Sequence, residues 1–148
     1  MKTFIRVTSC GILLLAAAFV VSTTHIRKSS AAPKDTDIQR GKYLVEEVAK
    51  CTECHTPRDA QGQLDHDHWM QGASIWITPV HANPQWAERA PTIAGFGGYS
   101  DQDGVNILEK GIGANGEPIR PPMHIYHMKH EDALAIIAYL RSLPTAPQ

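Results

Sequence analysis

Five consecutive residues, Cys51-Thr52-Glu53-Cys54-His55, constrain this chain more than any other segment. Cysteines three positions apart on a helical turn project to the same side of the backbone, so both thiols can form thioether bonds to the two vinyl groups of one porphyrin. The histidine that follows then brings an imidazole beneath the iron as its proximal ligand. The motif therefore predicts covalent attachment of one c-type haem through Cys51 and Cys54, with His55 on the iron.

Three alternatives for the two cysteines compete with haem attachment. A disulfide between them would suit an oxidising compartment. A thioredoxin-type redox pair should open a helix after a strand, whereas this pair is expected to close a helix with no strand before it. A structural zinc site would need two more ligands, and His66 and His68 are separated by one residue instead of the usual spacer of roughly three to five. The terminal His55 and the export signal described next favour haem.

The first 32 residues have the order of an export segment. Lys2 and Arg6 precede an apolar run from Gly11 to Val21, which is typical of a signal peptide. We assign residues 1–32 to a signal peptide or, as the alternative, to an uncleaved N-terminal membrane anchor, because the apolar stretch approaches the roughly 20 residues that cross a bilayer. Either assignment places a single haem domain, residues 33–148, in the periplasm or at the extracytoplasmic face of the cytoplasmic membrane.

The charge balance argues against nucleic acid as a partner. The 14 Lys and Arg residues against 15 Asp and Glu residues give a formal net charge of −1. Four of the basic residues lie in residues 1–32, where there is no acidic residue, so the remaining domain carries about −5. We therefore expect protein partners with a basic docking surface.

The segment before the motif has helical periodicity. Its positions i, i+3, i+4 and i+7 hold Gly41, Leu44, Val45 and Val48. We predict a helix that ends near Lys50, and its candidate N-caps are Asp35, Thr36 and Asp37. Gly41 costs about 1 kcal/mol of helix propensity but permits close approach of a second helix. This glycine therefore predicts a helix crossing.

Two further helices and a long irregular region complete the predicted fold. A helix should follow Ser100, whose capping-box partner is Asp103, and should end at Gly111. The last helix should run from about His130 to Leu143. Residues 56–98 hold many turn formers and no sustained period, which predicts loops and short helices that wrap a bound group. The tryptophans of that region are expected to wall an apolar site: Trp69, Trp76 and Trp86. No strand pattern appears, so the predicted class is all-α.

The second axial ligand is expected downstream of the motif. Pro121-Pro122-Met123 follows a glycine-rich loop, so the thioether can reach over the porphyrin while the two prolines hold an extended approach. Met123 is the predicted sixth ligand, because His/Met ligation is a recognised cytochrome c arrangement that raises the reduction potential. Met128 is the first alternative, and Met70 is a further one unless it serves in packing. The histidines that would give bis-His ligation, or would simply be solvated, are His124, His127 and His130.

Several segments besides the motif carry a family resemblance: Arg40-Gly41-Lys42-Tyr43-Leu44, Cys51 to Pro57, Ala90-Pro91-Thr92, Pro122-Met123, and Glu131-Asp132 with Ala138-Tyr139-Leu140-Arg141. With them the sequence resembles the class I cytochrome c family, in particular the single-haem domains of cytochrome subunits of bacterial alcohol and sugar-acid dehydrogenases. The resemblance implies a small all-α fold whose first and last helices cross at Gly41 and Tyr139 and whose loops wrap one covalent haem. It also implies that the Pro91 carbonyl holds the ring N–H of His55 and so increases its donor strength.

Two residues depart from the family pattern. His124 stands after Met123 where a proline is usual, and Lys129 stands where a Ser or Thr commonly caps the last helix.

Arg89 and Arg120 are candidate donors to the haem propionates, or else surface charges. The string Asp65-His66-Asp67-His68 reads more simply as a polar loop than as an ion site.

The expected function is electron transfer between an exported dehydrogenase or respiratory complex and an acceptor. No substrate bond would be made or broken, so we predict a carrier and not an enzyme. The alternative is a haem sensor or small-molecule-binding haem protein with a displaceable sixth ligand, and a third reading is an accessory subunit whose electrons go only to one dehydrogenase complex.

Overall fold

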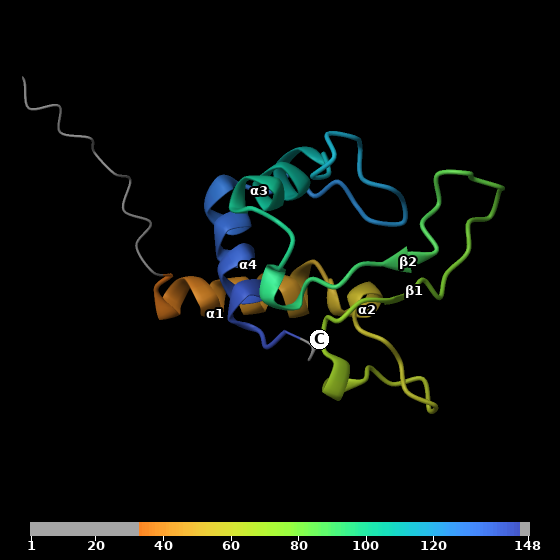
Figure 1. The fold of residues 1–148 in the computed structure, drawn as a ribbon, viewed down its shortest axis with the longest axis horizontal. Coiled ribbons are helices and arrows are strands. Elements are labelled where there is room, and N and C mark those ends of the chain that lie inside the picture. The colour runs from red at the N-terminus through yellow and green to blue at the C-terminus, as the bar shows by residue number, and fades with distance from the viewer. Residues whose placement is uncertain (1–32, 146–148) are drawn as a thin grey trace, which may run out of the picture. The chain divides into compact units, whose positions relative to one another are not determined.

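The computed structural model describes residues 33–145, and the predicted export segment lies outside the described residues. In chain order the elements are α1 (Asp35–Tyr43), a π-helical turn (Leu44–Val48), α2 (Thr52–His55), a 3₁₀ turn (His66–His68), β1 (Ala73–Ser74), β2 (Arg89–Ala90), a second 3₁₀ turn (Ala94–Phe96), α3 (Asp101–Lys110) and α4 (His130–Ser142). Figure 1 shows α1 and α4 crossing, α3 packed beside α4, and α2 at the start of the long connections.

The close approach of α1 and α4 centres on Gly41. A Cβ atom at this position would lie 2.0 Å from the carbonyl oxygen of Ala135 and 2.8 Å from the Cβ of Tyr139. Because a backbone carbonyl cannot rotate away as a side chain can, only glycine permits this approach. The predicted helix crossing is therefore confirmed.

The first helix ends in a π-helical turn directly before the haem motif. The backbone N–H of Ala49 donates to Leu44 O at 2.7 Å, and that of Cys51 donates to Val45 O at 3.0 Å. Lys50 takes a left-handed conformation with φ of 52°. A left-handed residue commonly ends a helix. The bond from Cys51 to Val45 reaches one residue further back than the usual bond at such an end, as follows a π-helical turn. The predicted end of the helix near Lys50 is confirmed, but its last five residues, Leu44–Val48, are π-helical, which the sequence did not indicate.

The starts of α1 and α4 are both occupied by lysine. The N-cap of α1 is Lys34, whose N–H donates to the Asp37 carboxylate at 3.4 Å, so none of the three predicted N-caps was right. The N-cap of α4 is Lys129, which makes no side-chain capping hydrogen bond. This agrees with the sequence, in which Lys129 replaces the Ser or Thr that commonly caps this helix. The backbone N–H groups at the start of α4 therefore have no side-chain acceptor from the N-cap residue.

The start and end of α3 follow the sequence prediction. The Ser100 hydroxyl accepts from the Asp103 N–H at 3.1 Å, and the Asp103 carboxylate accepts from the Ser100 N–H at 2.8 Å. Gly111 ends the helix with φ of 69°. Serine and glycine satisfy the end groups of a helix in this way without strain. The capping-box start and the glycine stop are both confirmed.

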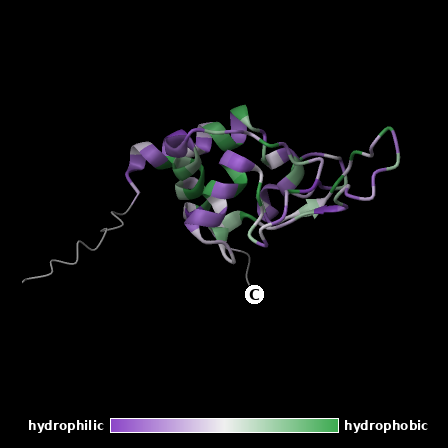
Figure 2. Cartoon of the chain, turned by 90° about the horizontal axis from the view of Figure 1, so that it is seen from above, coloured by the Kyte–Doolittle hydropathy of each residue, from purple (hydrophilic) through white to green (hydrophobic). Residues whose placement is uncertain are grey.

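Helix α4 supplies more buried hydrophobic residues than any other element of the described chain. Residues 135–140 of this helix are all buried. Figure 2 shows hydrophobic and hydrophilic residues alternating along the helices. The largest fully buried side chains of the described chain are Met70, Ile136, Val45 and Thr56. Met70 is therefore a core residue, which agrees with the interpretation that it serves in packing. Its N–H donates to the Thr56 hydroxyl at 3.0 Å.

The region between α2 and α3 is mainly loops and short turns, as predicted, but it contains a small ladder. Strands β1 and β2 pair antiparallel, with Ala73 opposite Ala90 and Ser74 opposite Arg89. The all-α prediction missed this pair because two-residue strands show no alternating pattern. Residues 75–88 form the loop that joins them and projects beyond the helices in Figure 1. Among residues 33–145, no helix has the length and apolar character needed to cross a bilayer.

Candidate haem-binding site

The two motif cysteines lie on one helical turn of their own. Cys51 is the N-cap of α2 with φ of −57° and ψ of −31°, and its carbonyl accepts from the His55 N–H at 2.9 Å. The prediction that this pair closes the preceding helix was wrong, because the left-handed Lys50 separates the two helices. The helical geometry still directs Cys51 and Cys54 to one side of the turn, as a two-point attachment to one porphyrin requires.

Both cysteines are free, half-buried thiols. Burial raises the pKa of the Cys51 thiol to about 11. Burial also raises the pKa of Cys54, with a smaller contribution from the negative charge of Glu53. Reactive redox cysteines have lowered pKa values, so these surroundings disfavour a thioredoxin-type pair. Within residues 33–145, no three His, Cys, Asp or Glu side chains lie close enough together to hold a metal ion.

The His55 imidazole is buried and held in one orientation. His55 is only 7% exposed, and its Nδ1 lies 2.7 Å from the carbonyl oxygen of Pro91. A carbonyl oxygen can only accept, so Nδ1 carries the hydrogen and Nε2 keeps its lone pair. Burial lowers the pKa of His55, and the bond to Pro91 only partly opposes this. The neutral tautomer is the one that binds a metal through Nε2.

Pro91 reaches His55 because the chain passes unusually close to Gly72. A Cβ at Gly72 would lie 2.9 Å from both the Ala90 carbonyl oxygen and the Thr92 nitrogen, and Gly72 has φ of +83°. The Gly72 N–H in turn donates to His55 O at 2.8 Å. Both the close approach and the positive φ favour glycine at this position. The β1–β2 ladder thus holds the segment that contains Pro91 against α2.

Met123 lies half-buried in a tight turn on the other long loop. Its N–H donates to Arg120 O at 3.3 Å, and residues 121–123 form a turn. The two prolines therefore bend the chain, and the predicted extended approach was wrong. The Pro121 carbonyl accepts from the Ala87 N–H at 2.7 Å, which ties this turn to the loop between β1 and β2.

The two candidate propionate donors already have protein partners. Arg120 donates to the carbonyl oxygens of Gln85 and Trp86, both at 3.0 Å, so it links the same two loops. Arg89 donates to the Ser74 hydroxyl at 3.0 Å across the β1–β2 ladder. Both arginines are exposed, which fits their simpler interpretation as surface charges.

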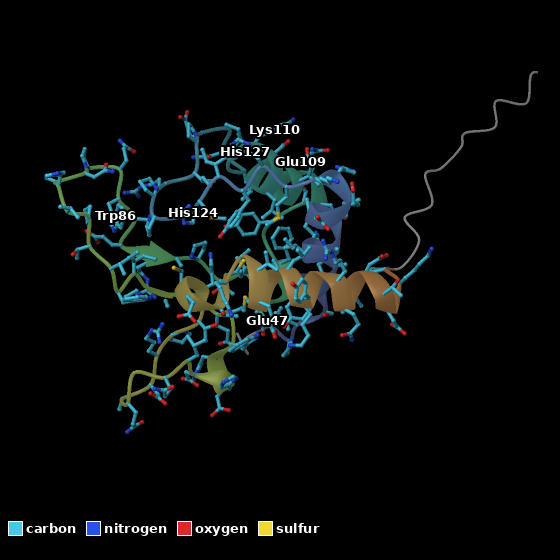
Figure 3. All side chains as sticks on the ribbon, turned by 180° about the vertical axis from the view of Figure 1, so that it is seen from behind. Glu47, Trp86, Glu109, Lys110, His124 and His127 are labelled. Atoms are coloured by element: carbon cyan, nitrogen blue, oxygen red, sulfur yellow. The ribbon has the colours of Figure 1, made fainter. Side chains whose placement is uncertain are left out.

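The alternative sixth ligands lie in different surroundings. Met128 packs against the core and its N–H donates to Leu108 O at 3.1 Å. His130 pairs with Glu109 at 2.8 Å at the start of α4. Figure 3 shows His127 near the end of α3, while His124 lies nearer to the loop that contains Trp86. Both His124 and His127 are exposed, as expected for solvated histidines.

The three tryptophans do not form one apolar wall. Trp69 packs against the core and stacks on His66 with ring centroids 4.8 Å apart. Trp76 is 60% exposed, and the Arg58 guanidinium lies 5.2 Å from its ring centre. Trp86 is half-buried and donates from Nε1 to Ile77 O at 3.3 Å. Only Trp69 fits the predicted apolar role; Trp76 lines a cavity of about 290 Å³ beside α2 that it shares with polar residues.

Tyr126 is a contact that the sequence analysis missed. Its hydroxyl donates to the carbonyl oxygen of Ala49 at 3.2 Å, which joins the loop of Met123 to the end of the π-helical turn. Burial, and then the nearby Cys51 and Cys54 thiols, raise the pKa of Tyr126 to about 12. Tyr126 has no helical period and no motif around it, so no pattern in the sequence pointed to this contact.

Residues 38–144 match the family model for cytochrome c. The chain belongs to the cytochrome c family. The residues present fit the group that defines this family, because two free thiols share one helical turn and a neutral, oriented imidazole follows them. Family membership implies covalent haem, and haem binding and electron transfer are the functions that it supports.

Several relatives of this cytochrome c are named as cytochrome subunits of dehydrogenases. It is 36% identical over 115 residues to the fructose dehydrogenase cytochrome subunit of Gluconobacter japonicus, across 73% of this chain and 22% of that protein. It is 29% identical over 149 residues to the cytochrome c subunit of the quinone alcohol dehydrogenase of Gluconobacter oxydans, across 89% of this chain and 29% of the relative. It is also 30% identical to a diheme cytochrome c-type protein of Cereibacter sphaeroides, across 80% and 38%. The chain thus spans about a fifth to two fifths of the length of these relatives.

Proposed function

We propose that this cytochrome c transfers electrons through one c-type haem, attached to Cys51 and Cys54 and ligated by His55 and Met123. The bound iron would supply the redox chemistry by alternating between its ferrous and ferric states. The observation that carries the proposal is the buried His55 ring, whose Nδ1–H donates to Pro91 O at 2.7 Å. This bond frees Nε2 for the iron and fixes the plane of the ring.

The surroundings of the motif suit a site of high reduction potential. Cys51 packs against the hydrophobic core. Apolar surroundings would disfavour the more charged ferric state, and a thioether ligand would favour the ferrous state. Burial keeps the His55 imidazole neutral, because its pKa lies below the ordinary value. The protein would orient the axial ligands, exclude water from the haem and determine which residues bind the iron. No residue of the site would make or break a substrate bond.

Met123 remains our choice for the sixth ligand on the basis of its loop. Its turn is tied to residues 85–87, and the same loop returns to the haem motif through Tyr126. The loops from the two sides of the motif would wrap the haem between them. Met128 is less suited because its backbone is bound to α3 and its side chain packs on the core.

The relatives indicate the class of partner and the compartment. Proteins named as cytochrome subunits of fructose, alcohol and gluconate dehydrogenases suggest that this chain receives electrons from an exported dehydrogenase or respiratory complex. We assign residues 1–32 to export or membrane anchoring and residues 33–148 to the haem domain, outside the cytoplasm. The excess of acidic residues after position 32 favours a partner with a basic docking surface, and such docking weakens with salt.

Replacement of Met123 tests the ligand assignment directly. Met123→Ala in the haem-loaded protein should abolish the weak red charge-transfer band of sulfur-ligated ferric haem, whereas the matched Met128→Ala should keep it. Loss of the band in Met128→Ala alone would contradict the assignment. A purified protein with no bound haem by mass would contradict the whole proposal.

Carbon monoxide separates a carrier from a sensor. A carrier with both axial ligands in place should bind carbon monoxide slowly or not at all in its ferrous form at neutral pH. Rapid binding would favour the alternative of a displaceable sixth ligand. The half-buried position of Met123 is the observation that keeps this alternative in view.

A further inference from the structure

The loop that carries Met123 is held to the rest of the chain by few hydrogen bonds. At its ends, Pro121 O accepts from the Ala87 N–H and the Met128 N–H donates to Leu108 O. Among the described residues, only one hydrogen bond links the stretch between them, residues 122–127, to a distant part of the chain. That bond runs from the Tyr126 hydroxyl to Ala49 O at 3.2 Å.

Ala49, the acceptor of this bond, lies close to the haem motif in the chain. It follows the π-helical turn and lies two residues before Cys51. Carbonyl groups at the end of a helix lack intrahelical partners, so the Tyr126 hydroxyl satisfies one of them. The Tyr126 ring is half-buried and packs against the hydrophobic core, and His124 meets it edge-on with ring centroids 6.0 Å apart.

We propose that Tyr126 is a positioning residue that latches the Met123 loop onto the first helix and thereby keeps the sixth ligand in place. The inference rests on the proposed His/Met ligation. Met123 is itself half-buried in a turn held by a local bond to Arg120. Within residues 122–127, the Tyr126 hydroxyl makes the one hydrogen bond to a distant described residue, and it adds to the packing of the Tyr126 ring on the core and of Ile125 beside Gly111. Closure of the loop toward the motif is therefore expected to weaken when this bond is lost.

Loss of this hydroxyl should raise the population of the open loop. A net hydrogen bond is worth enough that its removal shifts such an equilibrium by roughly fivefold. An external ligand that needs the open loop then binds more tightly by the same factor, because its apparent affinity follows the open fraction. Tyr126→Phe keeps the aromatic ring and its packing, so only the latch is removed.

The test uses ferric, haem-loaded protein titrated with imidazole and followed by its absorption spectrum. We expect Tyr126→Phe to bind imidazole roughly fivefold more tightly than the parent, and to lose the sulfur charge-transfer band at lower imidazole concentration. Tyr99→Phe is the matched control: its ring stacks on Phe96 at 5.2 Å, and its hydroxyl makes no hydrogen bond among the described residues. It should bind imidazole as the parent does.

Two outcomes would overturn the latch. Imidazole affinity of Tyr126→Phe within a factor of about two of the parent would show that the hydroxyl does not control the loop. An equal gain in Tyr99→Phe would show a general loosening of the fold. Met123→Ala separates failure of the latch from failure of the ligand assignment. If Met123→Ala keeps the charge-transfer band, the ligand assignment is wrong. If Met123→Ala loses the band and Tyr126→Phe binds imidazole as the parent does, only the latch is wrong.

Discussion

Gly41→Ala should separate the two helices that hold the fold together. The new Cβ would lie 2.0 Å from Ala135 O and 2.6 Å from Ala135 C, whereas real Cβ contacts stay above 3.0 Å. The helices must therefore move apart by about 1 Å, which overpacks a core region that includes Tyr139. Overpacking of this kind costs up to about 3 kcal/mol, and the better helix propensity of alanine returns about 1 kcal/mol. The expected net loss is about 2 kcal/mol.

Urea and thermal unfolding of the haem-loaded protein would measure this loss. For a domain of this size, about 2 kcal/mol corresponds to a fall in Tm of roughly 10 °C. Gly97→Ala is the matched control, since a Cβ there meets nothing within 4 Å and Gly97 has φ of −67°. It should be neutral or stabilise by up to about 1 kcal/mol. If Gly41→Ala is as stable as the parent while Gly97→Ala behaves as expected, the crossing does not depend on the missing side chain.

Three further substitutions test the ends of the helices by urea unfolding. Lys50→Gly should stabilise by about 1 kcal/mol, because Lys50 has φ of 52°; an unchanged or lower midpoint would contradict this. Lys129→Ser should add a cap to α4 and also stabilise by about 1 kcal/mol, with Lys129→Ala as the control that should not. Ser100→Ala should cost about 1 kcal/mol at neutral pH. Hydrogen bonds from Ser100 lower the pKa of Asp103 below its ordinary value of 3.8, so their contribution is present above that pH and lost as pH falls through the lowered pKa. A deficit in Ser100→Ala that persists unchanged at lower pH would contradict the capping role of the carboxylate.

Local signals in the sequence were sufficient for the elements that obey local rules. Ser100, Asp103 and Gly111 fix α3 because capping and the left-handed stop act within a few residues. Gly41 predicted the crossing because a glycine on an apolar helical face is costly without a neighbour that needs the space. The haem motif itself is a covalent requirement and does not depend on the surrounding fold.

Long-range contacts were beyond local rules. The π-helical turn before Cys51 changes register without any proline or glycine to mark it, and its neighbours Tyr126 and Tyr139 come from the other end of the sequence. The Tyr139 hydroxyl donates to the Glu46 carboxylate inside this turn. The β1–β2 ladder also lacks a sequence signal, because a strand of two residues is too short to show an alternating pattern. These features arise from tertiary packing, which overrides local preference.

The two sides of the proposed haem differ in how firmly the chain fixes them. On the side of His55, burial, the bond to Pro91 and the close packing of Gly72 all restrain the ligand. On the side of Met123, the loop is half-exposed, and within residues 122–127 the one distant hydrogen bond to another described residue comes from Tyr126. A ligand held by fewer contacts opens at a lower free-energy cost, so exchange at the iron should occur on the methionine side. Whether this cytochrome c acts as a closed carrier or admits a small molecule therefore depends on the stability of one loop, while the histidine side serves either function.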